Sequence, residues 1–229
     1  MFKSLNFGDF SFLCPTSGYH ETEVGKVFMG VEYPIPTQMQ DSPSLNIVDI
    51  GANIGSFTAY SKLCFPQAKV SAFEPLPKAF QVLEANCKSF KNVHLFNFGL
   101  GNRKRQEKLY SVDASGTDAR SSIHVGTDNE TLVEVQDVKD VLSRDKIDIL
   151  KIDTEGCEIE ILGSIVGMGI PISILFLEWH SESDRRDLDR IIPPELMLTH
   201  MICAQPGLGT STYVTEKLLV DWKLKANRV

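Results

Sequence analysis

The stretch VDIGANIGSFTAY (residues 48–60) decides the fold of this chain. Its apolar start predicts a buried strand, and the residues from Gly55 onward have the pattern of a helix. Gly51 and Gly55 let the backbone turn tightly between the two elements and come close to a ligand. The first N–H groups of a helix have no partner inside the helix, so such a turn commonly holds a nucleotide. The stretch therefore predicts a nucleotide site.

The rest of the chain, from residue 46, alternates apolar runs with helical patterns. Strands are expected at 46–51, 68–75, 93–100, 146–156, 172–180, 197–205 and 211–219, and helices at 55–65, 76–90, 157–166 and 184–193. Strands rich in Val, Ile, Leu and Phe and separated by helices predict a parallel sheet covered on both faces. The turn-rich segment 205–210 predicts an antiparallel hairpin at the end of the sheet. We expect one α/β domain over 45–229, an N-terminal arm or cap over 1–44, and an exposed loop or lid at 111–130.

Composition excludes several classes of protein. The 229 residues carry a formal charge of −7, which disfavours a nucleic-acid partner, and the short basic cluster at 101–108 is interpreted as a solvated loop. The scattered, odd set of cysteines favours reduced thiols over disulfides or a zinc site: Cys14, Cys64, Cys87, Cys157 and Cys203. The N-terminus has no signal-peptide pattern, and no apolar run is long enough for a membrane span. We therefore expect a cytoplasmic location.

The first turn and the second strand end indicate the kind of nucleotide. Asp49 precedes Gly51, Ala52, Asn53 and Gly55, and the G-x-x-x-G spacing differs from the dinucleotide fingerprint and from the P-loop. An acid pointing into the pocket suits an amino-bearing ligand better than a pyrophosphate. Glu74, at the end of the second strand, is placed to accept hydrogen bonds from ribose hydroxyls. A ligand with a ribose and an amino group but no phosphate matches these features, and S-adenosylmethionine is such a ligand.

Polar side chains also follow the fourth and fifth predicted strands. Lys151 and Asp153 are two residues apart and share a face of their strand, as do Glu178 and His180. With Glu155 they are expected to converge on one cleft. A network of ion pairs without a catalytic role is an alternative interpretation. Asp153, Glu178 and His180 have acceptable ligand types for a metal, but nothing in their spacing demands one.

Four motifs together resemble the FkbM-type methyltransferases: VDIGANIGSFT (48–58), AFEPLPKAFQVLEANC (72–87), LKIDTEGCEIEIL (150–162) and FLEWH (176–180). The resemblance implies a class I, Rossmann-like, doubly wound sheet of seven mostly parallel strands with a C-terminal antiparallel hairpin. It implies methyl transfer from S-adenosylmethionine to a hydroxyl of a small natural product or sugar. The cofactor would be held by Asp49, Gly51, Ala52, Asn53, Gly55, Glu74, Pro75, Phe98 and Gly99. The acceptor side would comprise Asp153, Glu155 and His180. Lys151 is a further catalytic candidate from its place on the fourth predicted strand.

Transfer to a hydroxyl calls for a general base. His180 is the first candidate, because the unperturbed pKa of histidine lies near the working pH, and Asp153 is the second. Three other functions remain open from the residues: an NAD-linked oxidoreductase on a similar sheet, a nucleic-acid methyltransferase, and a non-catalytic module that binds the nucleoside. The missing dinucleotide fingerprint disfavours the first, and the acidic charge disfavours the second.

Overall fold

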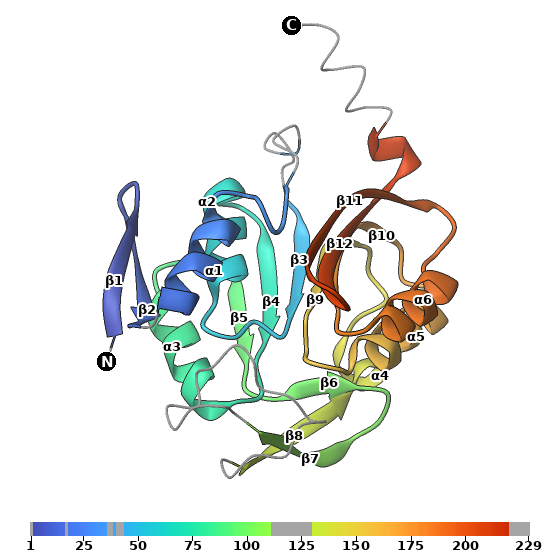
Figure 1. Ribbon diagram of the computed structural model, residues 1–229, viewed down its shortest axis with the longest axis horizontal. Helices are drawn as coiled ribbons and strands as arrows, with labels where there is room; N and C mark the ends of the chain where they lie inside the picture. The colour runs from blue at the N-terminus through green and yellow to red at the C-terminus, as the bar shows by residue number, and fades with distance from the viewer. Residues whose placement is uncertain (1, 17, 36–38, 40–43, 111–129, 220–229) are drawn as a thin grey trace, which may run out of the picture.

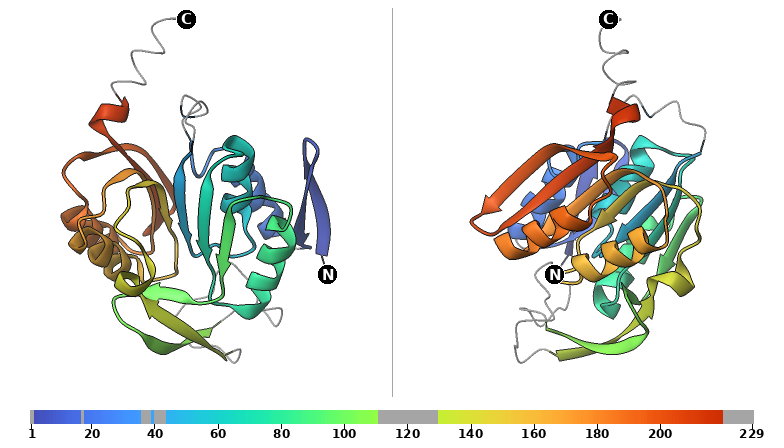
Figure 2. Two further views of the ribbon diagram at one scale, coloured as in Figure 1. Left: turned by 180° about the vertical axis from the view of Figure 1, so that it is seen from behind. Right: turned by 90° about the vertical axis from the view of Figure 1, so that its right-hand side faces the viewer.

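A seven-stranded sheet forms the centre of the molecule, with helices on both faces (Figures 1 and 2). The computed structural model describes residues 2–16, 18–35, 39, 44–110 and 130–219. In sheet order the strands are β11 (Leu196–Gln205), β12 (Leu208–Thr215), β10 (Ile172–Trp179), β9 (Ile147–Ile152), β3 (Asn46–Ile50), β4 (Lys69–Phe73) and β5 (Val93–Phe96). β12 runs antiparallel to both of its neighbours, and the other pairs are parallel. The predicted sheet is confirmed.

The helices divide between the two faces of the sheet. They are α1 (Gly18–Phe28), α2 (Ser56–Cys64), α3 (Pro77–Cys87), α4 (Val138–Val141), α5 (Glu158–Gly167) and α6 (Glu182–Ile191). Successive strand residues point to opposite faces. Ile47 therefore packs with Val27 of α1 and Phe57 of α2, whereas Val48 packs with Ile161 of α5 and Leu188 of α6. Burial on both faces explains why the central strands are continuous apolar runs.

Two smaller sheets were not expected from the sequence. β1 (Phe2–Phe7) and β2 (Phe10–Pro15) form a hairpin, and β6 (Gly99–Gly101), β8 (Glu130–Asp137) and β7 (Arg105–Tyr110) form a three-stranded sheet in that order. The interpretation of 101–108 as a solvated loop is therefore wrong, because Arg105 begins β7. The third predicted strand is divided into β5 and β6, and the last ends at Thr215, before a helical segment. Of the expected loop at 111–130, residues 111–129 lie outside the described residues.

The N-terminal segment packs on the main domain through aromatic side chains. The Phe7 and Phe28 rings stack with centroids 3.8 Å apart, and Phe12 meets Phe28 edge-on at 5.4 Å. Buried Phe12 and Val24 also lie in one apolar cluster with Val82 of α3. This packing holds α1 beside α2, at the edge of the site described below. In the described part of the chain, no helix has the length and apolarity needed to cross a bilayer.

Sheet order reverses between β3 and β9. The chain moves from β3 to β4 and β5 on one side and then returns to place β9 on the other. At this point the Asp153 N–H donates to the Ile50 carbonyl at 3.1 Å, which joins the two strand ends. Ligands of open α/β sheets bind beyond the carboxyl ends of the strands at such a reversal.

Candidate active site

A cavity of about 650 Å³ opens at the carboxyl ends of β3, β4, β9 and β10. The turn after β3 and the segment after β4 contribute to its lining, as do α1, residues 31–33 and the β11–β12 hairpin. Of the residues predicted from sequence, those that line it are Gly51, Ala52, Asn53, Glu74, Pro75, Gly99, Lys151, Asp153, Glu155, Glu178 and His180.

The turn after β3 is held by its two strand neighbours and by α3. Gly51 and Gly55 have φ angles of 78° and 89°, which favour glycine. A Cβ on Gly51 would lie 1.7 Å from the Asp153 carbonyl oxygen, and one on Gly55 would lie 2.6 Å from Leu83 Cδ1. Both glycines are thus required by close packing inside the protein, in addition to any approach of a ligand.

Glu74 takes part in the same turn. Its carboxylate accepts hydrogen bonds from the Asn53 N–H at 2.7 Å and from the Leu76 N–H at 2.8 Å. Glu74 is 5% exposed, and this burial raises the pKa of its carboxyl to about 7. Each carboxylate oxygen keeps a further lone pair, so the group that fixes the turn is still able to accept from a ligand in the cavity.

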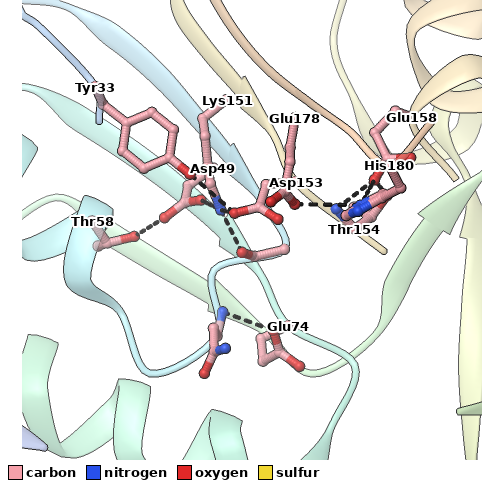
Figure 3. A network of polar contacts seen from close by, with 12 residues as sticks. Tyr33, Asp49, Thr58, Glu74, Lys151, Asp153, Thr154, Glu158, Glu178 and His180 are labelled. Carbon is pink, nitrogen blue, oxygen red and sulfur yellow. Dashed lines mark hydrogen bonds and ion pairs between the residues drawn. The ribbon is translucent and has the colours of Figure 1, made fainter. Parts of the chain in front are cut away.

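Lys151 joins the β3 and β9 ends (Figure 3). Its buried ammonium donates to the Gly51 carbonyl at 2.5 Å and lies 3.2 Å from Asp153 Oδ2 and 3.4 Å from Asp49 Oδ1. Burial alone would lower the pKa of Lys151, but the carboxylates of Asp153 and Asp49 raise it above its ordinary value. The lysine is therefore a fixed cation beneath the turn.

Asp49 does not point into the cavity, so that expectation is wrong. Its carboxylate is 0% exposed, accepts from Thr58 Oγ1 at 2.6 Å, and faces Lys151. It sits behind the turn, since on a strand Asp49 shares a face with Ile47 and points toward α2. Its place indicates that it positions Lys151 and the start of α2.

Asp153 and Glu178 form a coupled carboxyl pair. Tyr33 donates its hydroxyl to Asp153 Oδ2 at 3.0 Å. Burial and the adjacent Asp153 raise the pKa of Glu178 well above its usual range. Burial would also raise the pKa of Asp153, but Lys151 and a hydrogen bond with Glu178 hold it well below the usual value. We therefore assign the proton of the pair to Glu178 and the charge to Asp153.

His180 lies among carboxylates (Figure 3). Its Nε2 is 3.3 Å from Glu178 Oε2 and 3.5 Å from Glu158 Oε1, and its Nδ1 is 4.0 Å from Glu155 Oε2. Burial alone would lower the pKa of His180, but the neighbouring carboxylates, Glu158 first, raise it to about 9. The expectation of a pKa near neutrality is wrong. An imidazolium has no lone pair with which to accept a proton, so His180 is not suited to act as the base at pH 7.

The segment from Asp49 to Thr199 matches a known family. Residues 49–199 fit the family model described as the Methyltransferase FkbM domain. The chain belongs to the FkbM methyltransferase domain family.

Curated relatives of this FkbM domain include proteins named as methyltransferases. The methyltransferase sdnD of Sordaria araneosa is 32% identical over 155 residues, which cover 52% of this chain and 60% of that protein. The hexuronic acid methyltransferase AglP of Haloferax volcanii is 23% identical over 157 residues, covering 67% of this chain and 63% of that protein. The matched region thus spans about 60% of the length of these relatives.

Solved structures share the fold of this FkbM domain. TYW2 of M. jannaschii, solved in complex with AdoMet, aligns over 93% of this chain and 86% of that chain with a TM-score of 0.52 and 13% identity. The putative methyltransferase yhhF of Escherichia coli aligns over 90% and 92% with a TM-score of 0.50 and 11% identity. At such identities the likeness shows the fold alone.

The prediction from sequence missed or misplaced several features of the FkbM-domain site. Phe98 does not line the cavity; its ring packs on Phe73 and Phe96, with centroids 5.7 and 5.6 Å away. Glu32 and Tyr33 line the cavity from the segment GVEYPIP (30–36), which resembles the segment before the first motif of the family but was given no site role from the sequence. In the described part of the chain, no group of three or more His, Cys, Asp or Glu side chains is arranged to hold a metal ion.

Proposed function

We propose that this protein is an S-adenosylmethionine-dependent methyltransferase that methylates a hydroxyl of a small natural product or sugar. The observation that carries the proposal is the joining of two features in one cavity. A turn built around Gly51 and the Glu74 carboxylate suits a nucleoside without a phosphate. The cluster around Asp153 and His180 lines the same cavity and begins beside that turn, where Lys151 donates to the Gly51 carbonyl and contacts Asp153. The names of these two curated relatives support the same class of reaction, and the AdoMet complex of TYW2, which shares the fold, supports the cofactor.

The residues present fit this cofactor. Glu74 offers carboxylate lone pairs where ribose hydroxyls are expected in this fold. The Asn53 side-chain oxygen is buried and has no hydrogen-bond partner among the described residues, so it offers a free acceptor at the cavity wall. Asp153 supplies a negative charge for the positively charged methionine part. When bound, S-adenosylmethionine supplies a methyl group already activated on a sulfonium.

The protein's remaining task is orientation. Lys151 fixes the turn carbonyl of Gly51 relative to Asp153, and His180 Nε2 lies within ion-pair distance of both Glu158 and Glu178. Rigid placement of both reacting groups is worth about 7–11 kcal/mol in favourable intramolecular cases. The ion-pair network and the catalytic site are thus one arrangement, because the network holds the walls between which the reactants meet.

The charge of the cavity supports a small acceptor without phosphates. Carboxyl side chains line it at Glu23, Glu32, Glu74, Glu107, Asp153, Glu155 and Glu178. Against these stand two lysines, Lys26 and Lys151, and two histidines, His20 and His180. A nucleic-acid site requires clustered positive charge toward the backbone phosphates, and this surface has the opposite balance.

Binding and transfer test the proposal in two steps. S-adenosylhomocysteine at about 100 times its Kd stabilises a fold by about 2.7 kcal/mol, enough for a rise of several degrees in Tm. We expect that rise with S-adenosylhomocysteine and none with NAD. Tritiated methyl transfer is then measured with methyl glucoside, glucuronic acid, a hydroxylated macrolactone and a short RNA as acceptors. Binding of NAD alone, or transfer to RNA in preference to the small alcohols, would overturn the proposal.

A further inference from the structure

The carboxyl side chains that line the cavity differ in whether they have partners. Glu23 pairs with Lys26 at 2.8 Å, and Glu107 pairs with Arg105 at 2.8 Å. Glu74 accepts from two backbone N–H groups. These carboxylates therefore have defined structural tasks.

The carboxyl groups beneath the acceptor side are also engaged. Asp153 is held by Lys151 and Tyr33, Glu178 by Asp153 and His180, and Glu155 faces His180. Glu32 differs from all of these. Within residues 2–16, 18–35, 39, 44–110 and 130–219, its carboxyl makes no hydrogen bond or ion pair, although it lines the same cavity.

Charged groups surround Glu32 from two sides. Asp153 and Lys151 act on it from the end of β9, and Glu23 and Lys26 act on it from α1. Burial, followed by the carboxylates of Asp153 and Glu23, raises the pKa of Glu32 to about 7, and the two lysines partly oppose this shift. A general base is most effective when its pKa lies near the working pH.

The other candidates for the base are less suitable. His180 is protonated at neutral pH, and Glu178 holds the proton of its pair with Asp153. Asp153 is charged, but Lys151 and Tyr33 stabilise its charge and make it a weak base. The Glu32 carboxyl has no partner among the described residues and lines the cavity with this group.

We propose that the Glu32 carboxylate is the general base that removes the proton from the acceptor hydroxyl, an inference that rests on the proposed function. As the acceptor oxygen forms its bond to the methyl carbon, the carbon–sulfur bond breaks and its electron pair stays on sulfur. The sulfonium becomes the neutral thioether of S-adenosylhomocysteine. The hydroxyl proton passes to a Glu32 oxygen and then to solvent. Tyr33 and Asp153 position the acceptor side without taking the proton.

The variant Glu32→Gln tests the inference, since it keeps the shape of the side chain but removes the proton acceptor. We measure kcat at saturating S-adenosylmethionine between pH 5.5 and 9, using whichever small alcohol of the panel above is methylated, and the Kd for S-adenosylhomocysteine by calorimetry. The wild-type kcat should rise through about pH 7, as Glu32 ionises. In E32Q we expect kcat to fall by about 100-fold or more, because general bases contribute about 10²–10⁴-fold to the rate. We also expect the increase of kcat with pH to disappear. The Kd should stay within about twofold of the wild-type value, because the change spares the turn and Glu74.

Two charge variants on α1 provide a second test of the Glu32 carboxyl, through the pH dependence of kcat. Removing the negative neighbour with Glu23→Gln should move the rise in kcat to lower pH, and removing the positive neighbour with Lys26→Gln should move it to higher pH. These opposite shifts do not depend on how well E32Q folds. An E32Q enzyme with kcat within threefold of wild type and the rise intact would overturn the inference, as would shifts of the same sign in the two charge variants. If wild-type protein binds no S-adenosylhomocysteine, the proposed function itself fails, whereas normal binding with an unaltered E32Q profile refutes Glu32 alone.

Discussion

Replacing Lys151 with methionine should destabilise the protein strongly and in a pH-dependent way. The lysine is 3% exposed, and its ammonium is the buried counter-charge of Asp153 and of the fully buried Asp49. Asp49 Oδ1 has no hydrogen-bond partner in the described part of the chain and lies 3.4 Å from the Lys151 ammonium. Removing one partner of a buried ion pair costs about 3–5 kcal/mol. At about 2–4 °C per kcal/mol for a domain of this size, Tm should fall by roughly 10 °C.

The pH dependence distinguishes lost charge pairing from lost packing. Without Lys151, the Asp153 carboxyl becomes easier to protonate, and so its folded pKa rises. A raised pKa costs stability above that pKa and costs nothing once the group is protonated in both states. The difference in the free energy of unfolding between wild type and K151M should therefore be largest at pH 7.5 and should shrink as the pH falls toward 4.5. Urea unfolding followed by circular dichroism measures the free energy of unfolding at both pH values.

Lys62→Met provides the matched control. Lys62 is 2% exposed, but its ammonium donates to the Pro66 and Ala68 carbonyls at 2.8 and 2.7 Å, and no carboxylate pairs with it in the described part of the chain. Replacing it should lower the free energy of unfolding by less than about 3 kcal/mol, since only neutral carbonyls are left without a partner. This loss of stability should be the same at pH 4.5 and at pH 7.5. A K151M cost below about 1 kcal/mol, or one equal at the two pH values, would refute the reasoning.

Three further predictions follow from the site. His180 has its pKa raised to about 9, so its stabilising charge is complete below about pH 6.5 and lost as the pH rises through 9; an NMR titration of the ring with a midpoint below 7 would contradict this. Gly51→Ala should prevent folding or cost more than about 3 kcal/mol, because its Cβ would lie 1.7 Å from a backbone oxygen. Gly163→Ala, where a Cβ meets nothing within 4 Å, should fold normally. Glu74→Gln should weaken S-adenosylhomocysteine binding about tenfold by calorimetry, and wild-type binding should weaken below about pH 7 as Glu74 is protonated; equal affinities at pH 6 and 8 would argue against its role.

The central sheet was predictable because its signals are local. Each buried strand is a continuous apolar run, each helix shows its own period, and the β3 turn carries its glycines in sequence. β7 was missed because its sequence RQEKLY is polar on one face and lies beside a basic cluster. A half-exposed strand in a small sheet lacks the apolar run that distinguishes a buried one.

The sequence predicted which residues lie in the candidate site better than it predicted what each of them does there. The convergence of Lys151, Asp153 and His180 follows from strand order, which parallel strands make predictable. The pKa of His180 depends on distances to Glu158 and Glu155 that no pattern supplies. Asp49 was placed wrongly because residue types do not show which face of a strand is buried under a helix. Glu32 was not predicted as a site residue, since a lone glutamate before a strand is ordinary in any surface segment.

The origin of the cavity walls suggests how such domains can be altered. Residues 49–199 supply the turn and Glu74, whereas α1, Glu32 and the tip of the β11–β12 hairpin lie outside that range. The proposed donor side thus lies within residues 49–199, whereas the proposed acceptor side combines Asp153 and His180 of that range with the flanking Glu32 and hairpin tip. On the proposed function, exchanging the flanking portions between homologous domains should change which acceptor is bound while the cofactor turn is inherited unchanged. A library of chimeras joined at the two ends of residues 49–199 would test separately how the N-terminal and the C-terminal flanking portions affect the choice of acceptor.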